Sequence, residues 1–210
     1  MAILNPMSIG IIGAGAVGGY YGARLAEAGH DVTFLMRRDY NTVKSNGLTI
    51  KNPEGDLHIP KPQIVTDSKD ISPVDWVICA LKATTIDDVS ELIAPCLHEN
   101  TNILVLMNGL GLEEFFASLF REQHIFGGLA FTCINRGEPG IINHLDYGPI
   151  TIGHFGNDHE LVKHATNLWD TAKVEIIAAT SLLQARWEKL CWNIPFNGLA
   201  VVEGGITTDL

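Results

Sequence analysis

The chain has 210 residues, 46% of them hydrophobic and 18% charged, which is enough for one good core and part of a second. Its net charge of −10 argues against a nucleic-acid surface and against an anionic membrane as partners. Apolar runs stay shorter than the roughly 20 residues that span a bilayer, and the N-terminus lacks the basic segment and cleavage site of a signal peptide.

The cysteines and histidines indicate a reduced protein without a metal site. Cys79, Cys96, Cys133 and Cys191 are widely separated and form no CxxC pair, so we expect reduced thiols, most of them in apolar surroundings, and a cytoplasmic location. The eight histidines form no HExxH or similar ligand spacing, and we therefore expect no metal site.

The first 120 residues alternate short apolar runs with amphipathic stretches. SIGIIGAG predicts a strand, followed by a helix from about residue 18 to 28 that Gly29 ends. DVTFLM, VDWVICAL and NILVLMNG predict further strands, and the unalternating VDWVICAL is typical of a strand covered on both faces. Helices are predicted around residues 86–93 and 111–120. Strands that alternate with helices predict a parallel sheet with right-handed crossovers.

The middle of the chain changes character. Turn residues at 136–140 lie between β-rich runs and predict an antiparallel hairpin. A helix carrying Leu161, Ala165, Leu168 and Trp169 and the strand VEIIAA follow, and a new helix is expected to begin near Ser181. The change from mixed to purely helical character predicts a domain boundary near residue 179.

Three glycines follow the first strand directly and open the first helix. Gly13, Gly15 and Gly18 form G-x-G-x-x-G, in which the first permits a tight turn, the second lets the backbone approach a pyrophosphate and the third lets helix and strand pack closely. The alternative is a merely structural glycine turn. The residues expected to bind the cofactor here are Gly13, Ala14, Gly15, Ala16, Val17 and Gly18.

This motif and the order of elements predict an α/β fold. We expect a Rossmann-type parallel sheet with an antiparallel hairpin extension, followed by the start of an all-helical second domain. Residues 1–179 would form the dinucleotide-binding domain, and residues 180–210 the beginning of the helical substrate domain.

The end of the second strand bears on the choice between NAD and NADP. An NAD site usually places an acidic residue there to bind the 2′-hydroxyl of the ribose. Met36, Arg37 and Arg38 stand there instead, so a guanidinium would bind a 2′-phosphate and no carboxylate would repel it. Lys82 is expected at the same edge of the sheet. We therefore predict NADP; the alternative is a solvated basic pair at a strand end.

A polar stripe interrupts the last helix. The segment RWEKLCWNIPFNGLAVV, residues 186–202, carries Lys189, Asn193 and Asn197 at intervals of four, which places their side chains in one slanted row. A nicotinamide cofactor implies hydride transfer, and a buried lysine with a lowered pKa could donate the accompanying proton while asparagines orient the substrate. The alternative is a solvent-facing polar edge. Pro195 predicts a kink before Asn197.

Four segments in this order carry a resemblance to a known family. GAGAVGGYYGARLAEAGHDVTFLMR, ALKA, LMNGLG and KLCWNIPFN together resemble the ketopantoate reductase (2-dehydropantoate 2-reductase) family over nearly the whole chain. The resemblance implies a Rossmann domain and an all-helical domain with the active site between them. It also implies NADPH-dependent reduction of ketopantoate to pantoate, on the route to pantothenate and coenzyme A.

The resemblance implies roles for individual residues. Lys189 matches that family's general acid, and Asn193 and Asn197 match its substrate-binding asparagines. Asn108 matches an asparagine near nicotinamide and substrate. Arg37 and Lys82 match the basic residues that meet the 2′-phosphate.

The chain ends at Leu210, before most of that family's helical domain. The serine and glutamate that complete the family's active site have no counterpart, so we expect either a fragment or a partner that covers the terminal helix, such as a second copy in a homodimer. Two other functions stay open. One is an NADP-dependent reductase of another small 2-keto acid, and the other is a non-catalytic dinucleotide-binding sensor.

Overall fold

The computed structural model describes residues 5–205, which form a ten-stranded sheet with helices on both faces. The strands are β1 (Ser8–Ile12), β2 (Asp31–Leu35), β3 (Leu48–Lys51), β4 (Leu57–Ile59), β5 (Gln63–Val65), β6 (Trp76–Cys79), β7 (Asn102–Val105), β8 (His124–Arg136), β9 (Ile141–His154) and β10 (Ile176–Ala178). The α-helices are α1 (Ala16–Ala28), α2 (Tyr40–Asn46), α3 (Val89–Ile93), α4 (Leu112–Leu119), α5 (His159–Asn167) and α6 (Leu182–Val202). Short 3₁₀ helices are η1 (Ser68–Asp70), η2 (Ala83–Asp88) and η3 (Ala94–Cys96).

The centre of the sheet is parallel, as the alternation of strands and helices predicts. Its strand order is β4-β3-β9-β8-β7-β6-β1-β2-β5, with β10 beside β9, and β5, β2, β1, β6, β7 and β8 all run in one direction. All four residues of β6 and of β7 are buried, which explains why their sequences show no polar alternation. The α/β fold with a parallel sheet is therefore confirmed.

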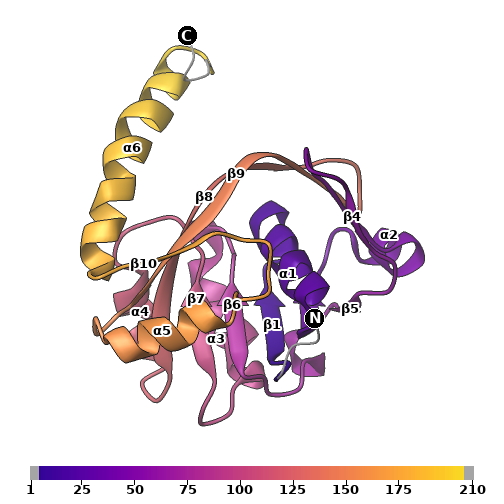
Figure 1. Cartoon of the computed structure of the whole chain (residues 1–210), viewed down its shortest axis with the longest axis horizontal. Helices are drawn as coiled ribbons and strands as arrows, with labels where there is room; N and C mark the ends of the chain where they lie inside the picture. Colours follow the sequence, from indigo (N-terminus) through magenta and orange to yellow (C-terminus); the bar gives the residue numbers. More distant parts are fainter. Residues whose placement is uncertain (1–4, 206–210) are drawn as a thin grey trace.

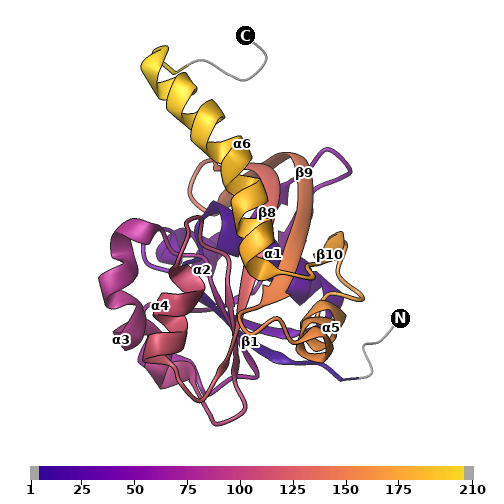
Figure 2. The ribbon, with the colours of Figure 1, turned by 90° about the vertical axis from the view of Figure 1, so that its left-hand side faces the viewer.

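Two hydrophobic layers sandwich this sheet. Ile9 and Ile11 of β1 face a core shared with α1 and the segment around α5, whereas Ile12 faces the core of α3 and α4. Figure 2 shows α3 and α4 on one side of the sheet and α1 and α5 on the other. The carboxyl ends of the parallel strands thus remain available to line a site between the layers.

The predicted hairpin is present, and it curls the sheet around α1. β8 and β9 pair antiparallel, with register shifts between Ala130 and Thr132 and between Cys133 and Ile134, and β9 then pairs in parallel with β3. Bulges of this kind bend a strand pair. Figure 1 shows the two long strands arching over α1 to reach β3 and β4. The turn of the hairpin is thereby carried from one edge of the sheet back toward the end of β2.

The structure differs from the sequence prediction in the segment between β2 and β6. It contains α2, β3, β4 and β5, which were not predicted, although Leu48 and Ile50 are buried alternate residues of a short strand. Of the helix predicted over 86–93, only α3 is α-helical, because the residues before Val89 belong to the 3₁₀ helix η2 and Pro95 follows the end of α3. Among the cysteines, Cys79 and Cys96 are buried, but Cys133 and Cys191 are exposed. The expectation that most of the cysteines lie in apolar surroundings is therefore met by only two of the four.

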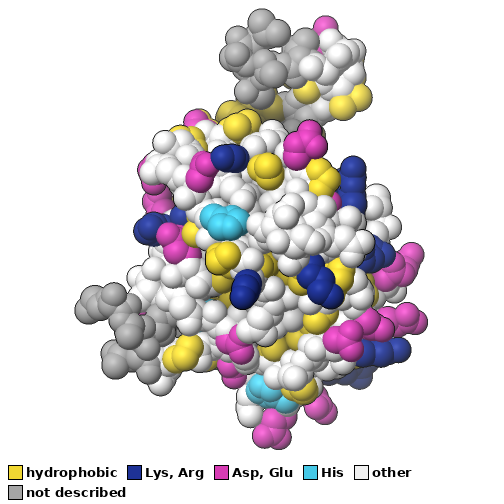
Figure 3. Space-filling model, turned by 90° about the vertical axis from the view of Figure 1, so that its right-hand side faces the viewer, with side chains coloured by type: hydrophobic (Ala, Val, Ile, Leu, Met, Phe, Trp, Pro, Cys, Tyr) yellow, Lys and Arg dark blue, Asp and Glu magenta, His cyan; other side chains and the backbone are white. Residues whose placement is uncertain are grey.

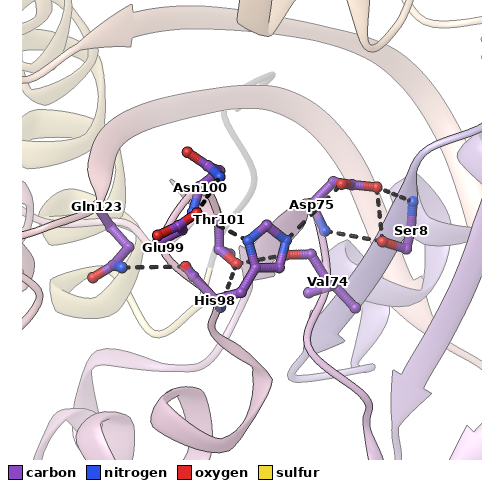
Figure 4. A network of polar contacts seen from close by, with 8 residues as sticks. All are labelled: Ser8, Val74, Asp75, His98, Glu99, Asn100, Thr101 and Gln123. Carbon is purple, nitrogen blue, oxygen red and sulfur yellow. Dashed lines mark hydrogen bonds and ion pairs between the residues drawn. The ribbon is translucent and has the colours of Figure 1, made fainter.

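A network of side chains fastens the loops at the amino edge of the sheet (Figure 4). The Asp75 carboxylate accepts hydrogen bonds from the backbone N–H and the hydroxyl of Ser8, both at 2.8 Å, and lies 4.0 Å from His98 Nε2. The Thr101 hydroxyl donates to the Val74 carbonyl at 2.6 Å. Because the carboxylate stands between serine and histidine, the histidine is not placed to take a proton from the hydroxyl, and the network is structural.

The last helix stands apart from the rest of the described chain. α6 begins after Ser181, whose hydroxyl accepts from the Gln184 N–H at 3.3 Å, and it continues through Pro195. Its first turns pack on β8 and β9, and the remainder rises away from the sheet in Figures 1 and 2. On the face drawn in Figure 3, acidic and basic side chains are interspersed and form no single-sign patch. No helix within residues 5–205 is both long and apolar enough to cross a membrane.

Candidate active site

The glycine loop has the geometry that each of its glycines predicts. Gly13 has φ +99°, and a Cβ there would lie 2.8 Å from backbone atoms of Ala80 and Leu81. A Cβ at Gly18 would collide with the carbonyl oxygen of Gly13, whereas one at Gly15 would meet open space. Gly13 therefore permits the tight turn, and Gly18 permits the close approach of helix and strand. Gly15 leaves its side of the loop open to a ligand.

The loop leads into an open helix N-terminus. α1 starts at Ala16 with Gly15 as its N-cap, and neither a side-chain cap nor an acidic residue occupies its first turn. The expected residues Ala16, Val17 and Gly18 form that turn. Free N–H groups and the positive end of a thirteen-residue helix favour an anion such as a pyrophosphate.

A cavity of about 270 Å³ opens beside this loop and collects basic side chains. It brings together Gly13, Ala14 and Gly15 with Arg37 and Lys82, as the sequence predicts. Arg37 and Lys82 are both exposed. Its lining is completed by Leu35, Met36, Arg38, Asp39, Ala80, Leu81, Thr85, Leu92 and Arg136. A glycine loop at a helix N-terminus next to several cations fits the phosphate-bearing part of a dinucleotide.

One expectation about this cavity is wrong. The sequence suggested that no carboxylate lies near the end of β2, but Asp39 lines the cavity, with its side chain 13% exposed. Its carboxylate accepts a hydrogen bond from the Arg136 guanidinium, which comes from the end of β8. The distance of 97 residues between the two explains why the sequence did not reveal the pair.

A second group of residues joins α6 to the end of β7. Arg186, 3% exposed, donates through Nε to Glu113 Oε1 at 3.0 Å and through Nη1 to the Met107 carbonyl at 2.9 Å. Its Nη2 donates to the Val105 carbonyl at 3.3 Å and also to Glu113. Glu113, in the first turn of α4, is itself buried. This buried ion pair fixes the start of α6 beside the carboxyl end of β7.

Lys189 lies one turn beyond Arg186 and faces the hairpin. Its Nζ donates a hydrogen bond to the Ala130 carbonyl of β8, and the side chain is partly buried. Burial, and then the positive charge of Arg186, lower the pKa of Lys189 to about 8. A lysine with this pKa exchanges its proton near neutral pH, so Lys189 can act as an acid or base.

The three expected asparagines come from two segments, the end of β7 and α6. Asn108 is exposed and directly follows Met107, whose carbonyl binds Arg186. Asn193 is partly buried and Asn197 is exposed, both on α6. None of the three lines the cavity beside the glycine loop, and neither does Lys189. The structure thus gathers the expected cofactor-binding residues around the glycine loop and holds Lys189 against β8, while Asn193 and Asn197 lie farther along α6.

Sequence reasoning missed Arg186, Glu113, Asp39 and Arg136. The sequence contained a signal for Arg186, because an arginine at the start of an apolar helix segment is rarely buried without a partner and therefore indicates an ion pair. Glu113 was equally visible in the apolar run LEEFF. Their pairing spans 73 residues and depends on the fold, so only the structure shows which charge meets which.

Comparisons with known proteins identify the family of this chain. Residues 9–157 match the family model described as ketopantoate reductase PanE/ApbA. A 2-dehydropantoate 2-reductase from Nostoc sp. is 39% identical over 99% of this chain and 67% of that protein. The solved 2-dehydropantoate 2-reductase from Geobacter metallireducens is 44% identical, with a TM-score of 0.88 over 92% of this chain and 64% of that one. The one from Methylococcus capsulatus is 33% identical, with a TM-score of 0.86 over 95% and 65%.

These relatives are longer than the chain, which spans about two thirds of their length. The family match covers most of the sheet and the glycine loop, and the Nostoc relative extends the similarity over nearly all of the chain, including α6. The resemblance to the ketopantoate reductase family is thereby confirmed. The chain belongs to the ketopantoate reductase PanE/ApbA family of oxidoreductases.

Proposed function

We propose that this protein reduces ketopantoate (2-dehydropantoate) to pantoate with NADPH, a step of pantothenate and coenzyme A synthesis. The observation that carries the proposal is the position of Lys189, which has a pKa of about 8 and is held on β8 one turn beyond Arg186, the residue that binds carbonyls at the end of β7. The family match and the names of the Nostoc and Geobacter metallireducens relatives support the substrate.

The cofactor would be held by the glycine loop and the basic cavity. The N–H groups of residues 16–18 and the positive end of α1 would bind the pyrophosphate, and Arg37 and Lys82 would bind the 2′-phosphate. When bound, NADPH supplies the hydride for the keto carbon. These assignments rest on the site's composition and on the family resemblance.

Lys189 would supply the proton that the reduced oxygen needs. The Lys189 ammonium would donate a proton to the keto oxygen, and the resulting amine would regain one from water. Asn193 and Asn197 would orient the hydroxyl and carboxylate of the substrate, and Asn108 would lie near the reacting carbon. Arg186 holds the helix that carries the lysine.

Replacing Lys189 tests the proposal. We expect Lys189→Ala to lower kcat by about 10²-fold or more while NADPH still binds, because a general acid contributes mainly to turnover. Glu188→Ala, at the neighbouring exposed position, is the matched control. Turnover in the unmodified protein should also fall as the pH rises above about 8, since only the protonated amine donates. Equal turnover of Lys189→Ala and its control would remove this role.

A panel of 2-keto acids separates the substrate alternatives. Ketopantoate has a branched, hydroxylated tail that simpler 2-keto acids lack. A clear preference for an unbranched acid would identify a different small-acid reductase. NADPH binding without oxidation by any acid of the panel would instead favour a sensor module.

Cofactor preference has its own test. We expect NADPH to bind more tightly than NADH by about tenfold or more, and Arg37→Ala to erase most of that difference, because one charge-assisted hydrogen bond is worth roughly 1.5–3 kcal/mol. Isothermal titration with each cofactor measures it. Equal affinities in the unmodified protein would overturn the NADP assignment.

A further inference from the structure

The cavity beside the glycine loop contains the elements of two opposite cofactor preferences. Arg37, Arg38 and Lys82 suit a 2′-phosphate. Asp39, which follows β2 as the N-cap residue of α2, is a carboxylate of the kind that binds the ribose hydroxyls of NAD and repels a 2′-phosphate. The preference between NADPH and NADH therefore depends on whether the Asp39 carboxylate is free to meet the ribose or is engaged by another residue.

Asp39 has one strong partner, and it comes from a distant segment. Although Asp39 is the N-cap residue of α2, its side chain makes no capping hydrogen bond. Its Oδ2 instead forms an ion pair with Arg136, the last residue of β8. The Asp39 side chain is 13% exposed and that of Arg136 is 34% exposed, so the pair is partly shielded from water. Shielding strengthens the pair relative to one on an open surface.

The hairpin explains why this arginine reaches the cavity. β9 pairs with β3, and the Thr49 N–H donates to the Gly140 carbonyl at 2.9 Å, which anchors the turn that follows Arg136 next to α2. The curled sheet therefore delivers a fixed positive charge to the end of β2.

We propose that Arg136 is a cofactor-selectivity residue that masks Asp39. By occupying the carboxylate oxygen and neutralising its charge, Arg136 leaves the charges of Arg37, Arg38 and Lys82 uncompensated and available to a 2′-phosphate. Without Arg136, Asp39 would accept hydrogen bonds from the ribose hydroxyls and disfavour NADPH. The inference rests on the proposed dinucleotide binding, but it concerns a residue outside the glycine loop and outside the residues given by the family resemblance.

The test measures binding of NADPH and NADH separately by isothermal titration. We expect Arg136→Gln to weaken NADPH binding by about tenfold and to leave NADH binding unchanged or tighter, which shifts the ratio toward NADH. Adding Asp39→Asn to Arg136→Gln should restore most of the NADPH affinity, because no carboxylate then remains to be masked. Arg121→Gln, an exposed arginine away from the cavity, is the matched control for lost positive charge.

The outcomes separate this inference from the proposed function. If Arg136→Gln weakens both cofactors equally, or if the double variant stays as weak as the single one, Arg136 does not act by masking Asp39. Thermal melts of each variant show whether the hairpin still folds. A lower Tm with an unchanged ratio of NADPH affinity to NADH affinity would assign Arg136 a purely structural role. If the unmodified protein binds neither cofactor, the proposed function itself fails. If it binds both equally, only the NADP assignment fails, and the ratio should still move in Arg136→Gln.

Discussion

The glycine-loop cavity and the terminal helix are held in place in different ways. Segments from the ends of β1, β2, β6 and β8 line the cavity, so its shape is fixed by the sheet itself. α6 instead joins the sheet mainly through buried Leu182 and Arg186, and most of its later side chains are exposed. A binding site built on strands inherits the rigidity of the core. The position of Lys189, by contrast, depends on a few contacts that single substitutions can remove.

The largest effect is expected when the buried pair that fastens α6 is broken. Arg186→Ala leaves the Glu113 carboxylate buried without its partner, which should lower the free energy of unfolding by about 3–5 kcal/mol. Urea denaturation measures it, and Gln184→Ala on the exposed side of the same helix is the control. The double variant Arg186→Met, Glu113→Leu should recover part of the loss. If Arg186→Ala unfolds like its control, α6 is held by other contacts.

A smaller effect distinguishes two glycines of the glycine loop. Gly18→Ala forces a Cβ against the Gly13 carbonyl and should cost about 1–3 kcal/mol of stability. Gly15→Ala places its Cβ in open space, so the melting temperature should hardly change while NADPH binding weakens, because the methyl group lies where the pyrophosphate is expected. Thermal melts and titrations of both variants provide the comparison. Unaltered NADPH binding by Gly15→Ala would show that the loop does not approach the cofactor.

The exposed part of α6 should make the chain self-associate. Trp187, Trp192, Ile194 and Leu199 are each 45–64% exposed, and a surface of this kind usually binds a partner. We propose a homodimer through α6, and we expect Ile194→Lys to weaken it by about tenfold, since burying such a side chain contributes about 1.5 kcal/mol or more. Sedimentation equilibrium measures it, with Gln184→Lys as control. A chain that stays monomeric at all concentrations would contradict this proposal.

Local signals made much of the fold and of the cavity predictable. Gly13, Gly15 and Gly18 act within a few residues of each other, and the unalternating strands reported their burial directly. The pairs Arg186–Glu113 and Arg136–Asp39 were not predictable, because each joins residues that only the sheet topology brings together. The β3–β4 pair was missed because strands of four and three residues carry too little periodicity. The domain boundary at residue 179 stays a prediction.

The smallest effect concerns the burial of Lys189 and its dependence on pH. The folded-state pKa of about 8 lies below the ordinary value of 10.5, so the charged lysine destabilises the folded protein at pH values below 8. Between pH 8 and 10.5 the unfolded chain holds more protons than the folded one, and stability therefore rises with pH in that interval.

Lys189→Met removes the charge, although it also removes the hydrogen bond to the Ala130 carbonyl. We expect this variant to be more stable than the unmodified protein by about 1 kcal/mol at pH 7 and the gain to shrink above pH 8. Thermal melts at pH 7 and pH 9.5 measure both terms, with Glu188→Met as control. A stability difference that does not change with pH would mean that Lys189 keeps its ordinary pKa, and that α6 leaves this side chain in contact with water.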